Sequence, residues 1–208
     1  MKRILAIDTS TDMSTLALVD GDQVIGSAEH TDARGHVEAI GTLFTQIPEL
    51  DHSNSQFRIP DLIVCGVGPG PFTGLRVGIA FGETLAFAWG IPVVGICSLD
   101  AVAHGIVRTE KLSGDFVAAI PARRGEYYWA SYTQFGQRIS GPHVNSTEQV
   151  ESNPLPIKTG FFPWGIDLAY CIGVAQELAV TPLYLRPPDA QPQAPNLGVN
   201  VGMRSHEQ

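Results

Sequence analysis

Residues 62–76 read LIVCGVGPGPFTGLR, in which a short apolar run is followed by a glycine- and proline-rich turn. Leu62–Gly66 is typical of a buried strand, and residues 68–71 turn the chain. The apolar pattern then predicts a helix over residues 73–89, and Gly90 follows it where helices commonly end. Strand, turn and helix in this order predict an α/β unit.

The segment before this block predicts three strands and one helix. Apolar runs at residues 4–7, 14–19 and 24–28 are typical of strands, and an Asp-Gly turn at residues 20–22 favours a hairpin between the last two. From residue 35 to residue 50, apolar side chains recur at spacings of three and four, which predicts an amphipathic helix.

The segment after the block continues the alternation of strands and helices. Residues 91–96 predict another apolar strand, and Ser98 is the predicted N-cap of a helix that reaches Ile106. Three strands, helix, strand, helix, strand and helix is the order of one actin-like (ribonuclease H-like) half.

A second, shorter pattern follows a polar break at residues 109–114. It predicts strands at residues 116–120, 126–133 and 137–141, with a turn at residues 123–125.

We therefore predict an α/β fold of two ribonuclease H-like or actin-like halves, with a mixed β-sheet flanked by helices. Residues 1–108 form the first half and residues 109–186 the smaller second half. Residues 187–208 are rich in Pro, Gln, Asn and Gly without apolar periodicity, which predicts a mobile tail.

Composition limits the functions that this chain can have. Its 208 residues are 44% hydrophobic, and 13 Lys and Arg against 21 Asp and Glu give a net charge of -8, which disfavours tight binding of nucleic acid by this chain alone. The apolar run at residues 4–7 is too short for a signal peptide, and no apolar run is long enough to span a membrane. We expect a cytoplasmic protein with no membrane contact.

The cysteines and histidines predict no metal site. Cys65, Cys97 and Cys171 are far apart and lie in apolar surroundings, so we expect reduced, buried thiols. No two histidines have the i, i+4 spacing that places two ligands on one helix face.

Five segments carry a resemblance to a known family. They are ILAIDTS at residues 4–10, GPGPFTGLR at 68–76, PVVGICSL at 92–99, ARRGEYY at 122–128 and YLR at 184–186. In order and spacing these segments resemble the TsaB (YeaZ) family, and the likeness covers residues 3–186.

The resemblance implies a function as well as a fold. It implies a non-catalytic actin-like subunit that binds and activates its catalytic paralogue TsaD, with the ATPase-type protein TsaE joining the pair. Together they form threonylcarbamoyladenosine at the adenosine beside the tRNA anticodon. It also implies a homodimer when the subunit is alone, indirect contact with tRNA, and no tightly bound cofactor, since the complex uses ATP and Mg through its partner subunits.

Two residues depart from the family pattern. Pro71 stands where the family usually has Ser, and it supplies neither a hydroxyl nor an amide donor. Pro121 stands where the family commonly has Asp. Both departures weigh against a ligand role for these two loops.

The loop from Gly68 through Gly70 to Thr73 has two interpretations. Free amides at the start of a helix attract anions, which would make the loop a phosphate cradle. No Gly-Lys-Ser/Thr follows it, so it could equally be a turn that connects strand to helix. Arg76 lies in the first helical turn, where a cation opposes the helix dipole and needs an acid or an anion nearby.

Asp8 is the predicted partner of Arg76. In actin-like ATPases an Asp that ends the first strand faces the nucleotide through its metal, so Asp8 and Thr9 could be the remnant of such a site. The alternative is that they cap a local turn.

Catalytic relatives have two metal-binding histidines on an early helix, whereas this chain has His36 and then Ile40, so His36 is predicted to be a helix-start or surface residue.

A stripe of glycines marks the predicted helix over residues 73–89. Gly74, Gly78 and Gly82 recur every four residues, and each costs a helix about 1 kcal/mol relative to Ala, so the stripe predicts close backbone approach. The helix is apolar nearly all round, so it needs cover from its own sheet and from either a neighbouring helix or another subunit.

The family resemblance favours another subunit at this stripe. The residues predicted for a partner interface are Gly74, Leu75, Gly78, Ile79, Gly82, Val37 and Ile40. The alternative function is an independent actin-like ATPase or small kinase, which Asp8 and the loop at residues 68–74 suggest. A peptidase is not supported, because the chain has neither a Gly-x-Ser-x-Gly motif nor a metal-binding pair.

Overall fold

The first sheet has the mixed topology that the alternating pattern predicts. The computed structural model describes residues 2–32 and 35–186, so the predicted tail at residues 187–208 lies outside it. The sheet has the strand order β3-β2-β1-β4-β5, and its members are β1 (Arg3–Asp8), β2 (Met13–Asp20), β3 (Gln23–Thr31), β4 (Leu62–Gly66) and β5 (Val93–Ile96). β1, β2 and β3 pair antiparallel, while β1, β4 and β5 run parallel.

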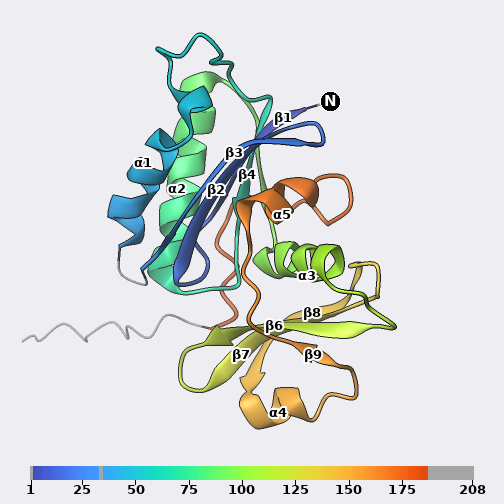
Figure 1. Ribbon diagram of the computed structural model, residues 1–208. Coiled ribbons are helices and arrows are strands. Elements are labelled where there is room, and N and C mark those ends of the chain that lie inside the picture. The colour runs from blue at the N-terminus through green and yellow to red at the C-terminus, as the bar shows by residue number, and fades with distance from the viewer. Residues whose placement is uncertain (1, 33–34, 187–208) are drawn as a thin grey trace, which may run out of the picture.

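Helices cover both faces of this sheet (Figure 1). One face packs against α1 (His36–Thr45), the short 3-10 helix η1 (Pro48–Leu50) and α2 (Phe72–Trp89). The other face packs against α3 (Ser98–Thr109) and α5 (Gly165–Tyr170). Successive strand residues point to opposite faces, so Leu5 and Ile7 join the first core while Ile4 and Ala6 join the second.

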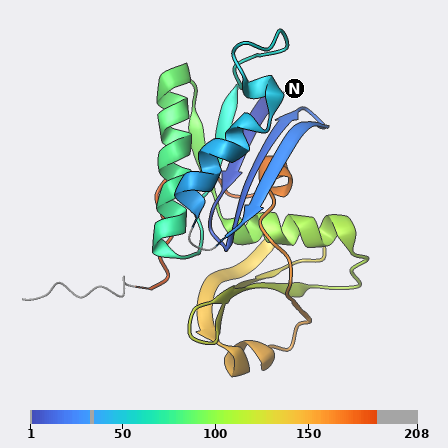
Figure 2. The same cartoon turned by 60° about the vertical axis from the view of Figure 1, so that its left-hand side comes forward.

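The second sheet is smaller and lies beyond α3 (Figure 2). Its strand order is β8-β7-β6-β9, from β6 (Phe116–Ala122), β7 (Glu126–Tyr132), β8 (Arg138–Ser146) and β9 (Ile157–Lys158). The short helix α4 (Thr147–Glu151) begins with a capping box between Ser146 and Gln149. α3 contributes Leu99, Val102 and Ile106 to a core with this sheet, so one helix serves both sheets.

The chain returns to the first sheet after α5. Gly95 and Leu178 exchange backbone hydrogen bonds, and the Leu183 N–H donates to the Val67 carbonyl oxygen at 2.7 Å. We call residues 178–186 the strap. The division into residues 1–108 and 109–186 stays a prediction, but α5 and the strap, which it assigned to the second half, pack against the first sheet.

The predicted fold class is confirmed, and the differences concern element ends. The first predicted helix ends at Thr45, because Pro48 starts a separate 3-10 turn. Ser98 is wrong as an N-cap, since Cys97 occupies the cap position and no side chain caps the helix. The three cysteines are buried and free, as predicted. Within residues 2–32 and 35–186, no helix is long and apolar enough to cross a membrane.

Candidate functional site

Asp8 ends β1 at the sheet edge where the parallel strands finish, and its carboxylate is sealed inside the protein. Its exposed fraction is 1%. The backbone N–H and the hydroxyl of Ser10 both donate to Oδ1 at 2.7 Å, and the Ser98 hydroxyl donates to Oδ2 at 2.6 Å. Burial raises the pKa of Asp8 to about 6, although these hydrogen bonds act to lower it. These are the bonds of a residue that caps a turn and joins β1 to α3.

The predicted pair between Asp8 and Arg76 is wrong. Arg76 is exposed, its Nε donates to the Tyr184 hydroxyl at 3.0 Å, and its guanidinium carbon lies 3.8 Å from the centre of the Phe72 ring. The cation is therefore stabilised by aromatic side chains and not by a carboxylate.

Thr9 ties β1 to α2. Its hydroxyl donates to the Gly74 carbonyl oxygen at 2.6 Å and accepts the Gly78 N–H at 3.0 Å. Thr9 is buried and both bonds are internal, so this residue holds the helix on the sheet.

The glycine stripe gives close backbone approach, as predicted, but inside the chain. A Cβ at Gly74 would lie 2.4 Å from the Thr9 carbonyl oxygen, one at Gly78 would lie 2.4 Å from the Thr9 hydroxyl, and one at Gly82 would lie 2.3 Å from the Cys65 sulfur. The stripe therefore faces β1 and β4, and the prediction that it faces another subunit is wrong.

The other residues predicted for the partner interface are buried inside the chain, with one exception. Leu75, Ile79 and Ile40 are buried in the chain's own core, whereas Val37 is 63% exposed. Only Val37 among the seven predicted interface residues is available to a partner.

The loop between β4 and α2 is fastened to its neighbours. The Gly68 N–H donates to the Ser98 hydroxyl at 3.1 Å, and the Ser98 N–H donates to the Gly68 carbonyl oxygen at 2.7 Å. A Cβ at Gly70 would lie 2.1 Å from the Ser10 carbonyl oxygen, so only glycine fits there. The fold thus gathers Asp8, Thr9, Gly68 and Gly70, while Thr73 and Arg76 lie exposed on α2.

His36 starts α1, as predicted, but it is buried and not a surface residue. Its Nδ1 lies 2.7 Å from the Ser14 hydroxyl, which is hydrogen-bonding distance, and burial lowers its pKa. Among the described residues, no group of three His, Cys, Asp or Glu side chains could hold a metal ion.

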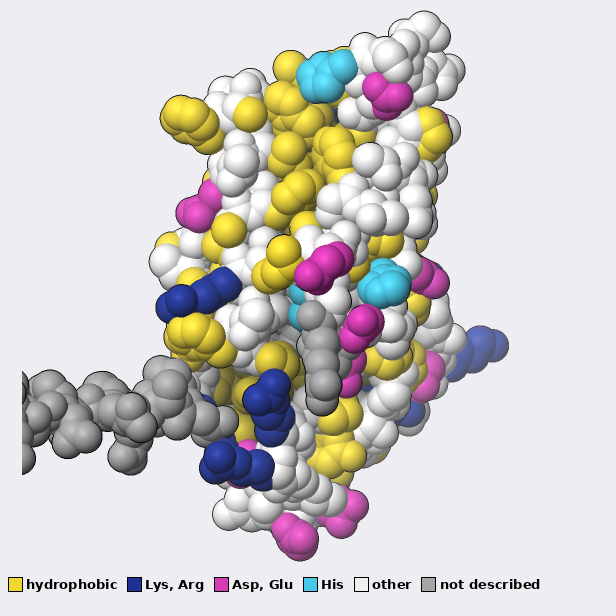
Figure 3. All heavy atoms as spheres, turned by 90° about the vertical axis from the view of Figure 1, so that its left-hand side faces the viewer, with side chains coloured by type: hydrophobic (Ala, Val, Ile, Leu, Met, Phe, Trp, Pro, Cys, Tyr) yellow, Lys and Arg dark blue, Asp and Glu magenta, His cyan; other side chains and the backbone are white. Residues whose placement is uncertain are grey.

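The outer surfaces of α1 and α2 form an apolar stripe on the side of α2 that faces away from the buried glycines. We define the α1–α2 face as Val37, Gly41 and Phe44 of α1 with Val77, Ala80, Phe81, Thr84 and Phe87 of α2. Figure 3 shows hydrophobic side chains running along these helices. Phe87 is 91% exposed, and Glu83 is the one charged residue of α2 after Arg76.

Comparison with known proteins gives consistent matches. Residues 24–169 match the family model described as TsaD: tRNA N6-adenosine threonylcarbamoyltransferase. TsaB of Escherichia coli is 35% identical over 148 residues, which are 71% of this chain and 62% of that protein. A solved structure of YeaZ from Pseudomonas aeruginosa is 25% identical with a TM-score of 0.71, and the match covers 89% of this chain and 100% of that chain.

The chain belongs to the TsaB (YeaZ) family. An uncharacterised protein of Mycobacterium tuberculosis is 36% identical over 92% of this chain and 95% of its own length. The chain spans 57% of the length of a Mycobacterium leprae relative and 62% of the length of Escherichia coli TsaB.

The two departures from the TsaB pattern fit their local backbone. Pro71 precedes α2 with φ -61°, the angle that a proline ring imposes. Pro121 lies opposite Tyr127 in the β6–β7 hairpin, while the described pairing of β6 with β9 involves only Val117 and Ala118. Pro121 therefore stands within β6 without interrupting the described strand pairs.

Proposed function

We propose that this chain is a non-catalytic subunit that binds and activates TsaD during formation of threonylcarbamoyladenosine beside the tRNA anticodon, in a cytoplasmic complex. The names of the TsaB relatives and the match to the TsaD family model support this pathway. TsaE joins the pair and, with TsaD, handles the ATP and Mg that the complex uses. tRNA contacts this chain only indirectly.

The α1–α2 face carries the proposal. Phe87 and Val37 are large exposed apolar side chains on the same two helices as the partly buried rings of Phe44 and Phe81, whose centroids are 5.8 Å apart. Contiguous apolar surface that a partner removes from water drives association. Gly41, Ala80 and Thr84 add small side chains, which let a partner helix approach closely. In the absence of TsaD, the same face pairs with a second copy of the chain.

The sealed carboxylate favours a partner subunit over an independent ATPase or kinase. In such an enzyme Asp8 would have to reach the metal of the bound nucleotide. Here both of its oxygens accept hydrogen bonds from buried donors, and a Cβ at Gly66 would collide with the carboxylate. Reaching a ligand would require breaking these contacts.

A charge placed on the α1–α2 face tests the proposal. Phe87→Arg should leave the fold intact, because the side chain is almost wholly exposed, but should abolish co-elution with TsaD and lower threonylcarbamoyladenosine formation in parallel. Phe135→Arg is the matched control, since Phe135 is 76% exposed but lies between β7 and β8. Its complex with TsaD should elute normally.

Two results would contradict the proposal. One is unchanged binding and activation of TsaD by Phe87→Arg. The other is ATP hydrolysis or phosphoryl transfer by the isolated chain that Asp8→Asn abolishes, which would favour the ATPase or kinase.

A further inference from the structure

A cleft between the two halves gathers arginines in an otherwise acidic protein. Its volume is about 250 Å³, and it is lined by Asp12, Gly70, Phe72, Pro121, Arg123, Arg124, Glu126, Tyr128, Tyr184 and Arg186. Figure 3 shows Lys and Arg side chains gathered below the apolar stripe. With Arg76, which lies on the Phe72 ring, four of the 13 Lys and Arg residues meet at this cleft, although the net charge is -8.

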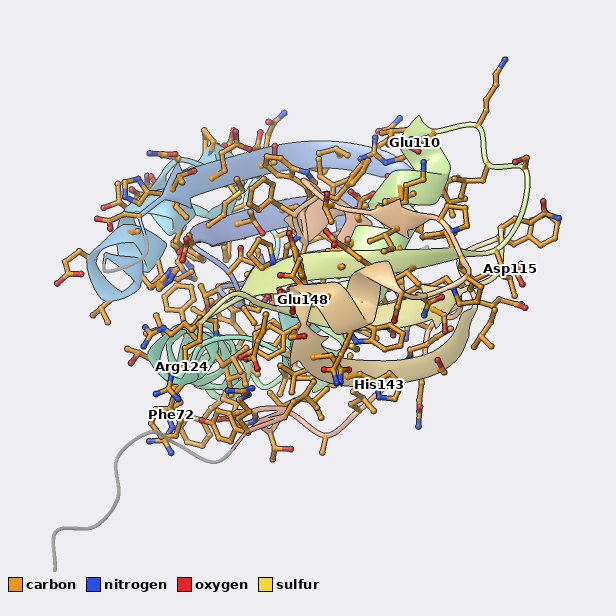
Figure 4. All side chains as sticks on the ribbon, turned by 90° about the horizontal axis from the view of Figure 1, so that it is seen from below. Phe72, Glu110, Asp115, Arg124, His143 and Glu148 are labelled. Atoms are coloured by element: carbon orange, nitrogen blue, oxygen red, sulfur yellow. The ribbon has the colours of Figure 1, made fainter. Side chains whose placement is uncertain are left out.

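The cleft joins a cationic side to an aromatic side. Arg123 and Arg124 form the tip of the β6–β7 hairpin, and Phe72 begins α2; Figure 4 shows Arg124 and Phe72 on the same side of the molecule. The rings of Phe72 and Tyr184 stack with centroids 5.0 Å apart, which fixes the aromatic wall. Glu126 pairs with Arg186, and Asp12 is the other carboxylate that lines the cleft.

Arg124 has a backbone conformation that is energetically unfavourable for a residue with a side chain. Its φ is 65°, the one left-handed value at a non-glycine residue among the described residues, and Gly125 follows with φ 71°. Gly and Asn adopt this conformation readily, whereas Arg does not. Strained residues of this kind concentrate at binding sites.

We propose that this cleft binds a single nucleotide-sized phosphorylated ligand through Arg123 and Arg124, without a divalent metal. Guanidinium groups match phosphate oxygens in geometry and charge, and the fixed rings supply an apolar wall for a planar base. The volume of about 250 Å³ lies below the usual range of about 300 to 1,000 Å³ for ligand sites, so the cleft suits a small ligand such as a mononucleotide better than a longer chain. Asp8, the carboxylate that would hold a metal in an actin-like ATPase, is sealed away from the cleft.

Calorimetric titration of the isolated chain in EDTA tests the site with three probes: AMP, adenosine and inorganic phosphate. AMP should bind saturably at millimolar concentrations or below, phosphate should compete with it, and adenosine should bind about tenfold more weakly or worse, since charge-assisted hydrogen bonds to the phosphate are lost. Added Mg²⁺ should not strengthen the binding of AMP.

Matched arginine variants separate a specific site from general charge. Arg123→Gln and Arg124→Asn should each weaken AMP binding about tenfold. Arg124→Asn should do so without lowering the melting temperature, because Asn relieves the left-handed backbone. Arg58→Gln removes the same charge from an exposed guanidinium that pairs with Asp20, at the opposite end of β2 from the cleft residue Asp12. The affinity of this variant for AMP should stay unchanged.

Four outcomes would overturn the proposal. They are no saturable binding of AMP, an absolute need for Mg²⁺, equal weakening in Arg58→Gln, and tighter Arg123-dependent binding of a short oligoribonucleotide than of AMP. The last outcome would assign the arginines to an RNA strand. Because all of these titrations use the chain alone, they are independent of whether it binds TsaD.

Discussion

Asp8 is a carboxylate surrounded by the donors of Ser10 and Ser98, and folding raises its pKa from 3.8 to about 6. An acid whose pKa is raised by folding costs stability when it is ionised. The cost is absent below pH 4, grows as the pH rises through the interval between the two pKa values, and is complete above pH 6. Two pKa units correspond to about 3 kcal/mol.

Replacing this carboxylate by an isosteric amide should change how stability depends on pH. We expect Asp8→Asn to gain stability relative to the natural chain as the pH rises. The difference in unfolding free energy, variant minus natural chain, should be higher at neutral pH than near pH 4 by up to about 3 kcal/mol. Urea denaturation across this range measures the difference. A difference between Asp8→Asn and the natural chain that stays the same from pH 4 to neutral pH would refute the assigned burial cost.

For single residues, the sequence predicted where a residue lies in its strand but not which distant residue it forms a hydrogen bond with. The pattern at residues 4–10 correctly placed Asp8 and Thr9 at the end of a strand. Asp8 bonds to Ser98, 90 residues away, and Thr9 bonds to Gly74, 65 residues away. Such pairs arise from the register of β1 with β4 and the angle of α2 on the sheet, neither of which periodicity specifies.

At the scale of elements, α2 shows what a periodic pattern can predict. The glycine spacing correctly predicted a smooth helical stripe and close packing. The spacing does not specify which surface packs against the stripe. The family resemblance favoured a partner subunit at that place. The structure assigns the stripe to β1 and β4 and leaves the opposite side of α2, with Ala80, Thr84 and Phe87, exposed.

Two helical glycines should therefore respond oppositely to the same substitution. Gly78→Ala should lower the unfolding free energy by about 1 to 3 kcal/mol, because the new methyl group collides with the Thr9 hydroxyl. Gly41→Ala should raise it by up to about 1 kcal/mol, because its Cβ meets nothing within 4 Å and Ala favours a helix. Chemical denaturation of both variants checks the pair; a destabilised Gly41→Ala together with an unaffected Gly78→Ala would reverse the assigned faces.

At the scale of the whole molecule, the strap connects the two halves. The Leu183 N–H donates to Val67, the residue after β4 of the first sheet, while Tyr184 stacks on Phe72 and Arg186 pairs with Glu126 of the second sheet. The sequence predicted two halves and a segment ending at residue 186, but not this return, since residues 171–186 have no regular apolar period.

Truncation should separate the strap's contribution from that of later residues. A chain ending after Pro182 loses all three contacts, and we expect a melting temperature several degrees lower, corresponding to about 1 to 3 kcal/mol, with faster proteolysis of the β6–β7 hairpin. A chain ending after Arg186 keeps the contacts and should melt like the full chain. Identical melting of the two truncated chains would show that the strap contributes no stability.

The position of α5 also has a consequence for synthesis. Ile4 and Ala6 of β1 pack against Leu168, Ala169 and Cys171, which lie more than 160 residues later in the sequence. This face of β1 is therefore shielded from water only after α5 has been synthesised. Chains leave the ribosome at roughly 5 to 20 residues per second, so that face stays uncovered for many seconds in every nascent molecule. During this interval the emerging chain exposes apolar surface, so we expect its folding yield in cells to depend on chaperones that bind such surface.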